Sequence, residues 1–68
     1  NETCYYTGQH FCYDSSPFKP SIDRIDSSKG YIIGNVCLCC WYVNQMKRDL
    51  PLVIFLETCR MIAEKHPR

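Results

Sequence analysis

Residues 20–47 change their hydrophobic periodicity once, and this constrains the fold more than any other feature of the sequence. Residues 21–26 alternate between apolar and polar side chains, as a half-buried β-strand does. The Ser-Ser-Lys-Gly sequence at 27–30 is typical of a turn, where glycine supplies a backbone angle that β-branched residues avoid. A first strand that ends in a turn is therefore predicted.

The second half of this stretch predicts a strand followed directly by a helix. Residues 31–33 are apolar and β-branched, Gly34 interrupts the run, and residues 35–40 form a second short apolar strand. From Trp41 onward the apolar residues recur at helical spacing. A carboxylate near the end of the first strand and a carboxamide on the helix can then face one cleft.

Pro51 predicts the start of a second helix, because a proline at the first helical position lacks only an N–H group that would have no partner there. Apolar residues then recur on one side over three turns: Leu52, Phe55, Leu56, Cys59, Ile62 and Ala63. We expect this helix to cover about 50–66 and to close the core rather than to act in catalysis. The whole chain, 1–68, is predicted to be one small α+β domain.

Composition limits the function classes only weakly. The 68 residues carry eight Lys and Arg against seven Asp and Glu, a formal net charge of +1, so charge alone does not indicate nucleic-acid binding. No run of about 18 apolar residues is present in the sequence, so no membrane span is expected. No signal peptide is recognisable, but a mature chain could have lost one. A chain of this size buries a small core and often needs a metal, a disulfide or a partner.

Six cysteines in so short a chain allow three interpretations. A secreted disulfide scaffold is one, although Cys37, Cys39 and Cys40 crowd into one apolar strand. A metal site is the second. The third is that several of them are small buried hydrophobic residues, as free cysteines commonly are.

The polar residues of the stretch resemble a motif of the HNH endonuclease family, also called the ββα-metal or His-Me finger. The sequence Asp-Arg-Ile-Asp-x-x-x-Gly-Tyr-x-x-x-Asn-Val at 23–36 is similar to the branch of that family common in phage proteins. Asp23 takes the place of the family's aspartate, Asn35 that of its middle asparagine and Asn44 that of its helix ligand. Arg24 stands where the family has its catalytic histidine, which is a departure from the pattern.

This resemblance implies a ββα finger with an Ω-loop over residues 4–49 and a metal-dependent DNA endonuclease activity. Asp23 and Asn44 would hold Mg²⁺ or Mn²⁺, because such hard ions prefer oxygen ligands. Arg24 cannot act as a base, since its pKa stays above about 12, but it can bind the scissile phosphate. The basic residues expected at DNA backbone phosphates are Arg24, Lys29, Lys47 and Arg48.

The general base must then come from outside the motif. In related enzymes with Arg at this position, a tyrosine within the N-terminal knuckle takes this part, and the matching residue is Tyr6, in Cys4-Tyr5-Tyr6-Thr7-Gly8. A neighbouring Arg24 and a metal-bound phosphate would both favour its phenolate form. A packed aromatic with a hydrogen-bonded hydroxyl is the competing interpretation for Tyr6, and His10 is a second base candidate. Asn35, assigned to the catalytic centre, is expected to brace the loop.

The family's structural zinc site is expected to be absent. It uses two Cys-x-x-Cys knuckles, and here each has kept its first cysteine, Cys4 and Cys40, while Thr7 and Val43 replace the second. We expect Cys4 and Cys40 to lie near each other, as packed thiols or a bridge. A rebuilt zinc site would have to use Cys12, Cys39 or His10.

The favoured function is thus a DNA endonuclease acting in the cytoplasm of a bacterial host and encoded by bacterium or phage. One alternative is a non-catalytic, DNA-binding or regulatory relic of the finger, suggested by Arg24 and the half-lost knuckles. A secreted disulfide mini-protein is the other. So small a finger has little surface for base readout, so a homodimer or a further domain would be needed to recognise a long site.

Overall fold

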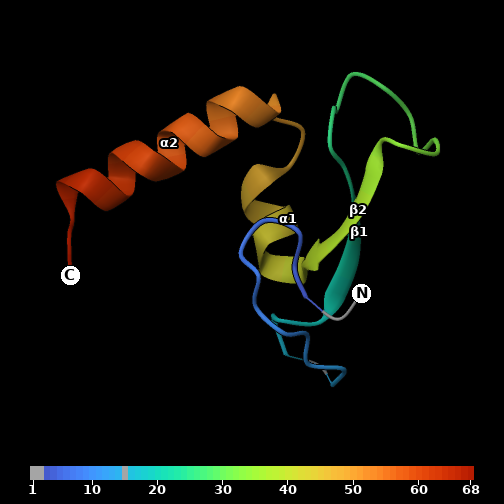
Figure 1. Ribbon diagram of the computed structural model, residues 1–68, viewed down its shortest axis with the longest axis horizontal. Helices are drawn as coiled ribbons and strands as arrows, with labels where there is room; N and C mark the ends of the chain where they lie inside the picture. The colour runs from blue at the N-terminus through green and yellow to red at the C-terminus, as the bar shows by residue number, and fades with distance from the viewer. Residues whose placement is uncertain (1–2, 15) are drawn as a thin grey trace.

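Two antiparallel strands and two helices make up the fold of the described residues, which are 3–14 and 16–68 of a computed structural model (Figure 1). Strand β1 covers Pro20–Arg24 and strand β2 covers Val36–Cys40. Helix α1 (Trp41–Lys47) follows β2 without a loop, and helix α2 (Leu52–Lys65) follows after a four-residue connection. The predicted α+β class is confirmed.

The strands pair in a register that places Pro20 opposite Cys40 and Arg24 opposite Val36. The predicted first strand was to continue to Asp26, but β1 ends two residues earlier, at Arg24. At Asp26 the side chain takes over the local hydrogen bonding: Oδ1 accepts bonds from the backbone N–H of Ser28 at 3.0 Å and from its hydroxyl at 2.7 Å. An aspartate that bonds the backbone two residues on favours a turn over a strand.

The apolar run at 31–33 has the composition of a strand but lies in the loop between β1 and β2. The N–H of Ile32 donates to the carbonyl of Gly30 at 2.9 Å, and the N–H of Asn35 donates to that of Ile32 at 2.9 Å, so this backbone is turned on itself. Gly34 completes the turn at a φ of 90°, which side chains with a Cβ rarely adopt. Ile33 is fully exposed, so its apolar character contributes nothing to the core.

An N-terminal segment, Thr3–His10, closes one side of the sheet. Thr3 and His10 form an isolated antiparallel bridge, and the N–H of Tyr5 donates to the carbonyl of Leu38 on β2 at 2.9 Å. The turn between them includes Gly8 at a φ of 75°. We call this segment the N-terminal knuckle.

The core lies where the knuckle, the sheet and the two helices meet. Its buried residues are Cys4, Phe11, Cys39, Cys40, Val43 and Phe55. Half of these are cysteines, so the interpretation of several cysteines as small buried hydrophobic residues is confirmed for these three.

Helix α2 contributes less to this core than its apolar stripe predicts. Phe55 is buried, whereas Leu56 and Ile62 of the same stripe are 43% and 60% exposed. Figure 1 shows the reason: the second half of α2 extends away from the sheet and from α1. None of the helices in the described ranges is long and apolar enough to cross a membrane.

Candidate active site

The Asp23 carboxylate lies at the centre of the candidate site. Asp23 is the fourth residue of β1 and is only 4% exposed, because its side chain contacts Tyr6 of the knuckle and Lys47 of α1. The hydroxyl of Tyr6, from the knuckle, donates a hydrogen bond of 2.5 Å to Asp23 Oδ2. The structure thus joins two residues that are 17 positions apart and that the sequence assigned to the same chemistry.

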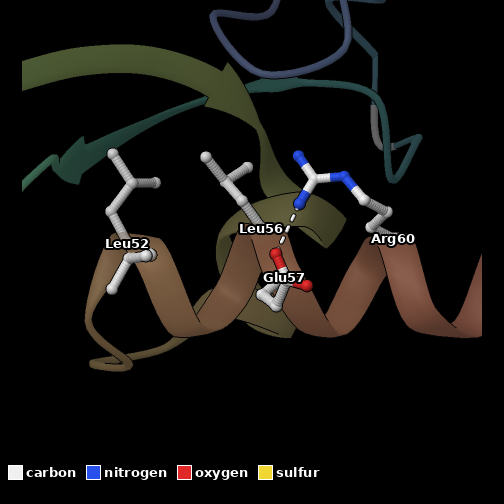
Figure 2. Close-up of a pocket in the computed structure, with 5 residues that line it drawn as sticks. Leu52, Leu56, Glu57 and Arg60 are labelled. Carbon is white, nitrogen blue, oxygen red and sulfur yellow. Dashed lines mark hydrogen bonds and ion pairs between the residues drawn. The ribbon is translucent and has the colours of Figure 1, made fainter.

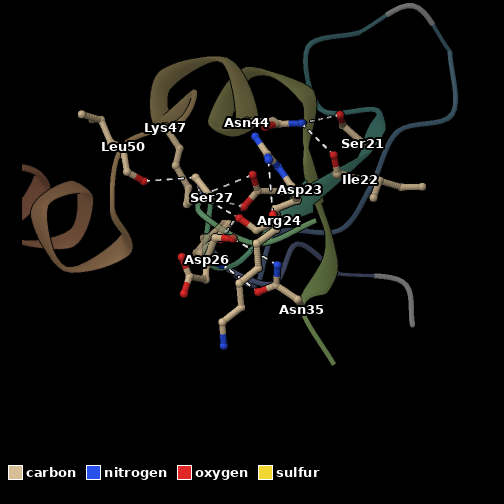
Figure 3. A network of polar contacts seen from close by, with 12 residues as sticks. Ser21, Ile22, Asp23, Arg24, Asp26, Ser27, Asn35, Asn44, Lys47 and Leu50 are labelled. Atoms are coloured by element: carbon tan, nitrogen blue, oxygen red, sulfur yellow. Dashed lines mark hydrogen bonds and ion pairs between the residues drawn. The ribbon is translucent and has the colours of Figure 1, made fainter. Parts of the chain in front are cut away.

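Lys47, at the end of α1, is the second partner of Asp23 (Figure 3). Its ammonium nitrogen lies 3.3 Å from Asp23 Oδ2 and 3.4 Å from Oδ1, and the side chain is fully buried. It also donates to the carbonyl of Arg24 at 2.9 Å and to Ser27 Oγ at 3.3 Å. A fully buried lysine is rare unless it is paired, and here every acceptor around it belongs to β1 or to the loop after β1.

This burial changes the interpretation of Lys47. The sequence pointed to a contact with DNA phosphates, but in this structure the ammonium has no exposed surface to offer one. The signal that could have found this is helical spacing. Lys47 lies one turn after Val43, which is a core residue, so both side chains are on the inner face of α1.

The environment of Tyr6 keeps its hydroxyl protonated. Burial raises the pKa of Tyr6 well above its ordinary value, and the hydrogen bond to the Asp23 carboxylate raises it further. The sequence-based expectation was the opposite, that Arg24 and a bound phosphate would favour phenolate. The guanidinium of Arg24 is engaged elsewhere, so without DNA the dominant neighbour of the phenol is an anion.

Arg24 follows Asp23 in β1, so its side chain leaves the opposite face of the strand. Its guanidinium donates to the carbonyl of Lys29 at 3.3 Å and lies over the ring of Tyr31, with 5.3 Å from Cζ to the ring centroid. Both contacts belong to the loop between β1 and β2, and Arg24 keeps part of its surface exposed. The structure therefore holds this charge at the edge of the site rather than against the Asp23 carboxylate.

Asn44 lies on α1 against the same strand as Asp23. Its amide nitrogen donates to Ser21 Oγ at 2.8 Å and to the carbonyl of Ile22 at 3.1 Å. Both N–H groups of the Asn44 side chain thus donate to acceptors on β1, and neither bond uses its amide oxygen. Asn44 is well placed to fix α1 on the strand that carries Asp23.

Asn35 braces the loop between β1 and β2. It is 7% exposed; its Oδ1 accepts from the N–H of Asp26 at 2.9 Å, and its Nδ2 donates to the carbonyls of Asp26 at 3.1 Å and Gly30 at 2.9 Å. These bonds supply the scaffold function expected for Asn35. The backbone N–H of Ile25 adds a bond of 2.8 Å to the Asn35 carbonyl, which closes the base of the loop.

Cys4 and Cys40 are in contact, as predicted: the backbone N–H of Cys40 donates to Cys4 Sγ at 3.3 Å. All six cysteines carry free thiols in the structure. His10 and Cys12, named for a rebuilt zinc site, are exposed, whereas Cys39 is buried.

His10, Lys29 and Arg48 are all exposed, and their roles as base or phosphate contact stay predictions.

The donor set decides how well a divalent ion would fit. Within residues 3–14 and 16–68, no three His, Cys, Asp or Glu side chains converge as a metal-binding group. One carboxylate, Asp23, and one carboxamide oxygen, Asn44, are hard ligands of the kind Mg²⁺ takes, and Mg²⁺ usually completes its shell with water and substrate phosphate. These two residue types are compatible with an ion that is shared with a phosphate, and the Lys47 ammonium is a competing cation at Asp23.

An open apolar groove on α2 is separate from this site. It is lined by Leu52, Val53, Leu56, Glu57 and Arg60, and Figure 2 shows the ion pair of Glu57 and Arg60 beside the two leucines. This groove includes neither Asp23 nor its partners, although Leu56 also lines a neighbouring pocket together with Tyr6.

Comparisons of the chain with protein-family models, curated proteins and solved structures gave no match.

Proposed function

We propose that this protein is a metal-dependent DNA endonuclease of the HNH type, which hydrolyses phosphodiester bonds and acts in the cytoplasm of a bacterial host. One observation carries the proposal: the Tyr6 hydroxyl from the knuckle donates to the Asp23 carboxylate on β1, and Asn44 of α1 bonds Ser21 and Ile22 of the same strand. Each of these residue types suits the chemistry, and the resemblance to the HNH family links all three.

In this proposal each side chain has one task. Asp23 and Asn44 would hold Mg²⁺ or Mn²⁺ through side-chain oxygens, while Asp23 keeps its bond to Tyr6. When bound, the ion neutralises phosphate charge and stabilises the leaving 3′-oxygen. Arg24 exchanges its contacts with the loop for the scissile phosphate, which is feasible because its bond to the Lys29 carbonyl is a long one, 3.3 Å.

Tyr6 is proposed to accept the proton of the attacking water. As the water oxygen bonds to phosphorus and the bond to the 3′-oxygen breaks, the water proton passes to the Tyr6 oxygen and the Tyr6 proton passes to Asp23 Oδ2. The raised pKa of Tyr6 favours such a transfer over a phenolate formed in advance. His10 is the second candidate for the base, and Lys29 and Arg48 are proposed to contact backbone phosphates.

Plasmid nicking in Mg²⁺ or Mn²⁺, against the same reaction in EDTA, tests this function. We expect nicking by the wild type, none in EDTA, and none by Asp23→Ala or Asn44→Ala. Tyr6→Phe should lose at least about a hundredfold in rate, as removal of a proton-transfer group does. Tyr5→Phe is the matched control, because Tyr5 is the neighbouring tyrosine and is 58% exposed.

A second function is favoured by a specific observation. Both oxygens of Asp23 are already engaged and the proposed base is held protonated, as expected of a DNA-binding finger that no longer cuts. If the wild type nicks no DNA with any divalent metal, but shifts a DNA duplex in a manner weakened by Arg24→Ala, this non-catalytic function replaces the first. If the wild type cuts DNA, Tyr6→Phe cuts at the same rate and His10→Ala does not cut, His10 is the base instead.

A further inference from the structure

The ion pair of Lys47 and Asp23 has a consequence for when the site can take up a metal. The carboxylate carries one negative charge and the ammonium one positive charge, and both are buried, so the pair is close to neutral without any ion. A divalent cation that approached Asp23 would meet the Lys47 ammonium a few ångströms away, where water does little to weaken the repulsion. The nearby carboxylate of Asp26 is exposed and accepts hydrogen bonds from Ser28 rather than from Lys47.

We infer that Lys47 is the resident counter-ion of Asp23, and that the site binds a divalent cation only together with a DNA phosphate. The phosphodiester supplies the negative charge that the protein lacks, so metal and DNA bind cooperatively. This inference deepens the proposed function and rests on it. It assigns Lys47 as a positioning and gating residue rather than as a contact to the DNA backbone.

The geometry also shows how Lys47 can yield to the metal without leaving its place. Its shortest hydrogen bond, 2.9 Å, is to the neutral carbonyl of Arg24, and another runs to Ser27 Oγ. Both distances to the Asp23 oxygens are longer, 3.3 and 3.4 Å. The ammonium can therefore release the carboxylate and keep its other partners, and a buried charge is not left without any hydrogen bond.

The first test measures metal binding without DNA and without activity. In Lys47→Met the Asp23 carboxylate loses its counter-ion, and a divalent ion should take that place. We expect about 10 mM Mn²⁺ to raise the Tm of Lys47→Met by about 5 °C or more and that of the wild type by less than about 2 °C. Lys65→Met, at the exposed end of α2, is the matched control and should behave as the wild type. The double variant Asp23→Asn, Lys47→Met should lose the response.

If Lys47→Met is unfolded without metal, folding induced by Mn²⁺ supports the inference equally, and Lys47→Gln offers a milder change that can still donate to the Arg24 carbonyl. If either variant is folded and Mn²⁺ stabilises it no more than the wild type, the inference is overturned. Nicking by the wild type would still stand in that case, so this failure is distinct from failure of the proposed function.

The second test uses the wild type alone and does not depend on the folding of any variant. Free Mn²⁺ is counted by electron paramagnetic resonance with protein, with a short DNA duplex, and with both, and Asp23→Asn with the duplex serves as the control. We expect the wild type to retain Mn²⁺ beyond the DNA background only when the duplex is present. Binding to the protein alone with a Kd below about 100 µM would overturn the inference, as would a wild-type complex that retains no more Mn²⁺ than the Asp23→Asn complex.

Discussion

Replacing Tyr6 with phenylalanine tests the centre of the site through stability alone. The substitution keeps the ring, which packs edge-on against Phe55, and removes only the hydroxyl that donates to Asp23 at 2.5 Å. A hydrogen bond to a charged group contributes about 1.5–3 kcal/mol, and a buried acceptor that loses its donor costs a similar amount. We expect urea unfolding of Tyr6→Phe to give a free energy of unfolding about 2 kcal/mol below that of the wild type.

The pH dependence of this difference has a definite sign. The pKa of Tyr6 is raised in the folded protein, so the stabilisation is fully present below the tyrosine pKa of the unfolded chain, about 10. Above that pH the unfolded chain releases the Tyr6 proton while the folded protein keeps it. The wild type should then lose stability relative to Tyr6→Phe by up to about 1.4 kcal/mol per pH unit.

Unfolding curves at pH 7, 10 and 11 for the wild type, Tyr6→Phe and the exposed control Tyr5→Phe measure both effects. Burial raises the pKa of Cys39 to about 12, above its value in the unfolded chain, so this thiol also makes stability depend on pH in this range. The comparison between variants removes this common contribution. A loss below about 0.5 kcal/mol at pH 7 would refute the placement of the Tyr6 hydroxyl on a buried carboxylate. So would a difference that does not shrink above pH 10.

Three further predictions concern the scaffold. Lys47→Met should lower the free energy of unfolding, measured without metal, by about 3–5 kcal/mol, because it leaves the buried Asp23 charge uncompensated. Adding Asp23→Asn should recover part of this loss. Equal stability of the single and the double variant in urea would argue against the ion pair. Asn35→Ala should cost about 2–3 kcal/mol, since three backbone groups of the loop lose their partner, whereas the exposed Ser28→Ala should cost less than about 1 kcal/mol. After denaturation without reductant, the protein should react with a thiol reagent at all six cysteines, and fewer reactive thiols would favour the disulfide alternative. The native protein should hold much less than one zinc per chain after dialysis, and stoichiometric zinc would point to Cys4 recruiting further ligands.

The elements of the fold were largely predictable because their signals are local. Alternation marked β1, the apolar run marked β2, and the change to helical spacing at Trp41 marked α1 at its observed first residue. The run at 31–33 misled because its strand composition is overridden by turns between Gly30 and Asn35, and tertiary context routinely decides such short segments.

The site was predictable only in part. The motif pointed to Asp23 and the knuckle to Tyr6, and the structure joins them, but neither gave a sign that their bond would raise the pKa of the phenol. Lys47 was assigned to DNA backbone phosphates with the other basic residues of the stretch, although it is fully buried in the structure. Its pairing with Asp23 depends on the angle at which α1 crosses β1, and no local pattern in the sequence encodes this angle.

The attachment of α2 at one end has a consequence for how this protein opens. Phe55 fixes the first two turns to the core, while every residue from Arg60 to Lys65 is exposed. A helix of 14 residues is marginal in water by itself, so the distal turns rely on cooperativity with the anchored ones. Amide hydrogens in these turns should exchange with solvent through local fraying, while those of β1, β2 and α1 wait for global unfolding. Protection factors should therefore decline steadily along α2, and the boundary of the cooperative folding unit falls within this helix rather than at its end.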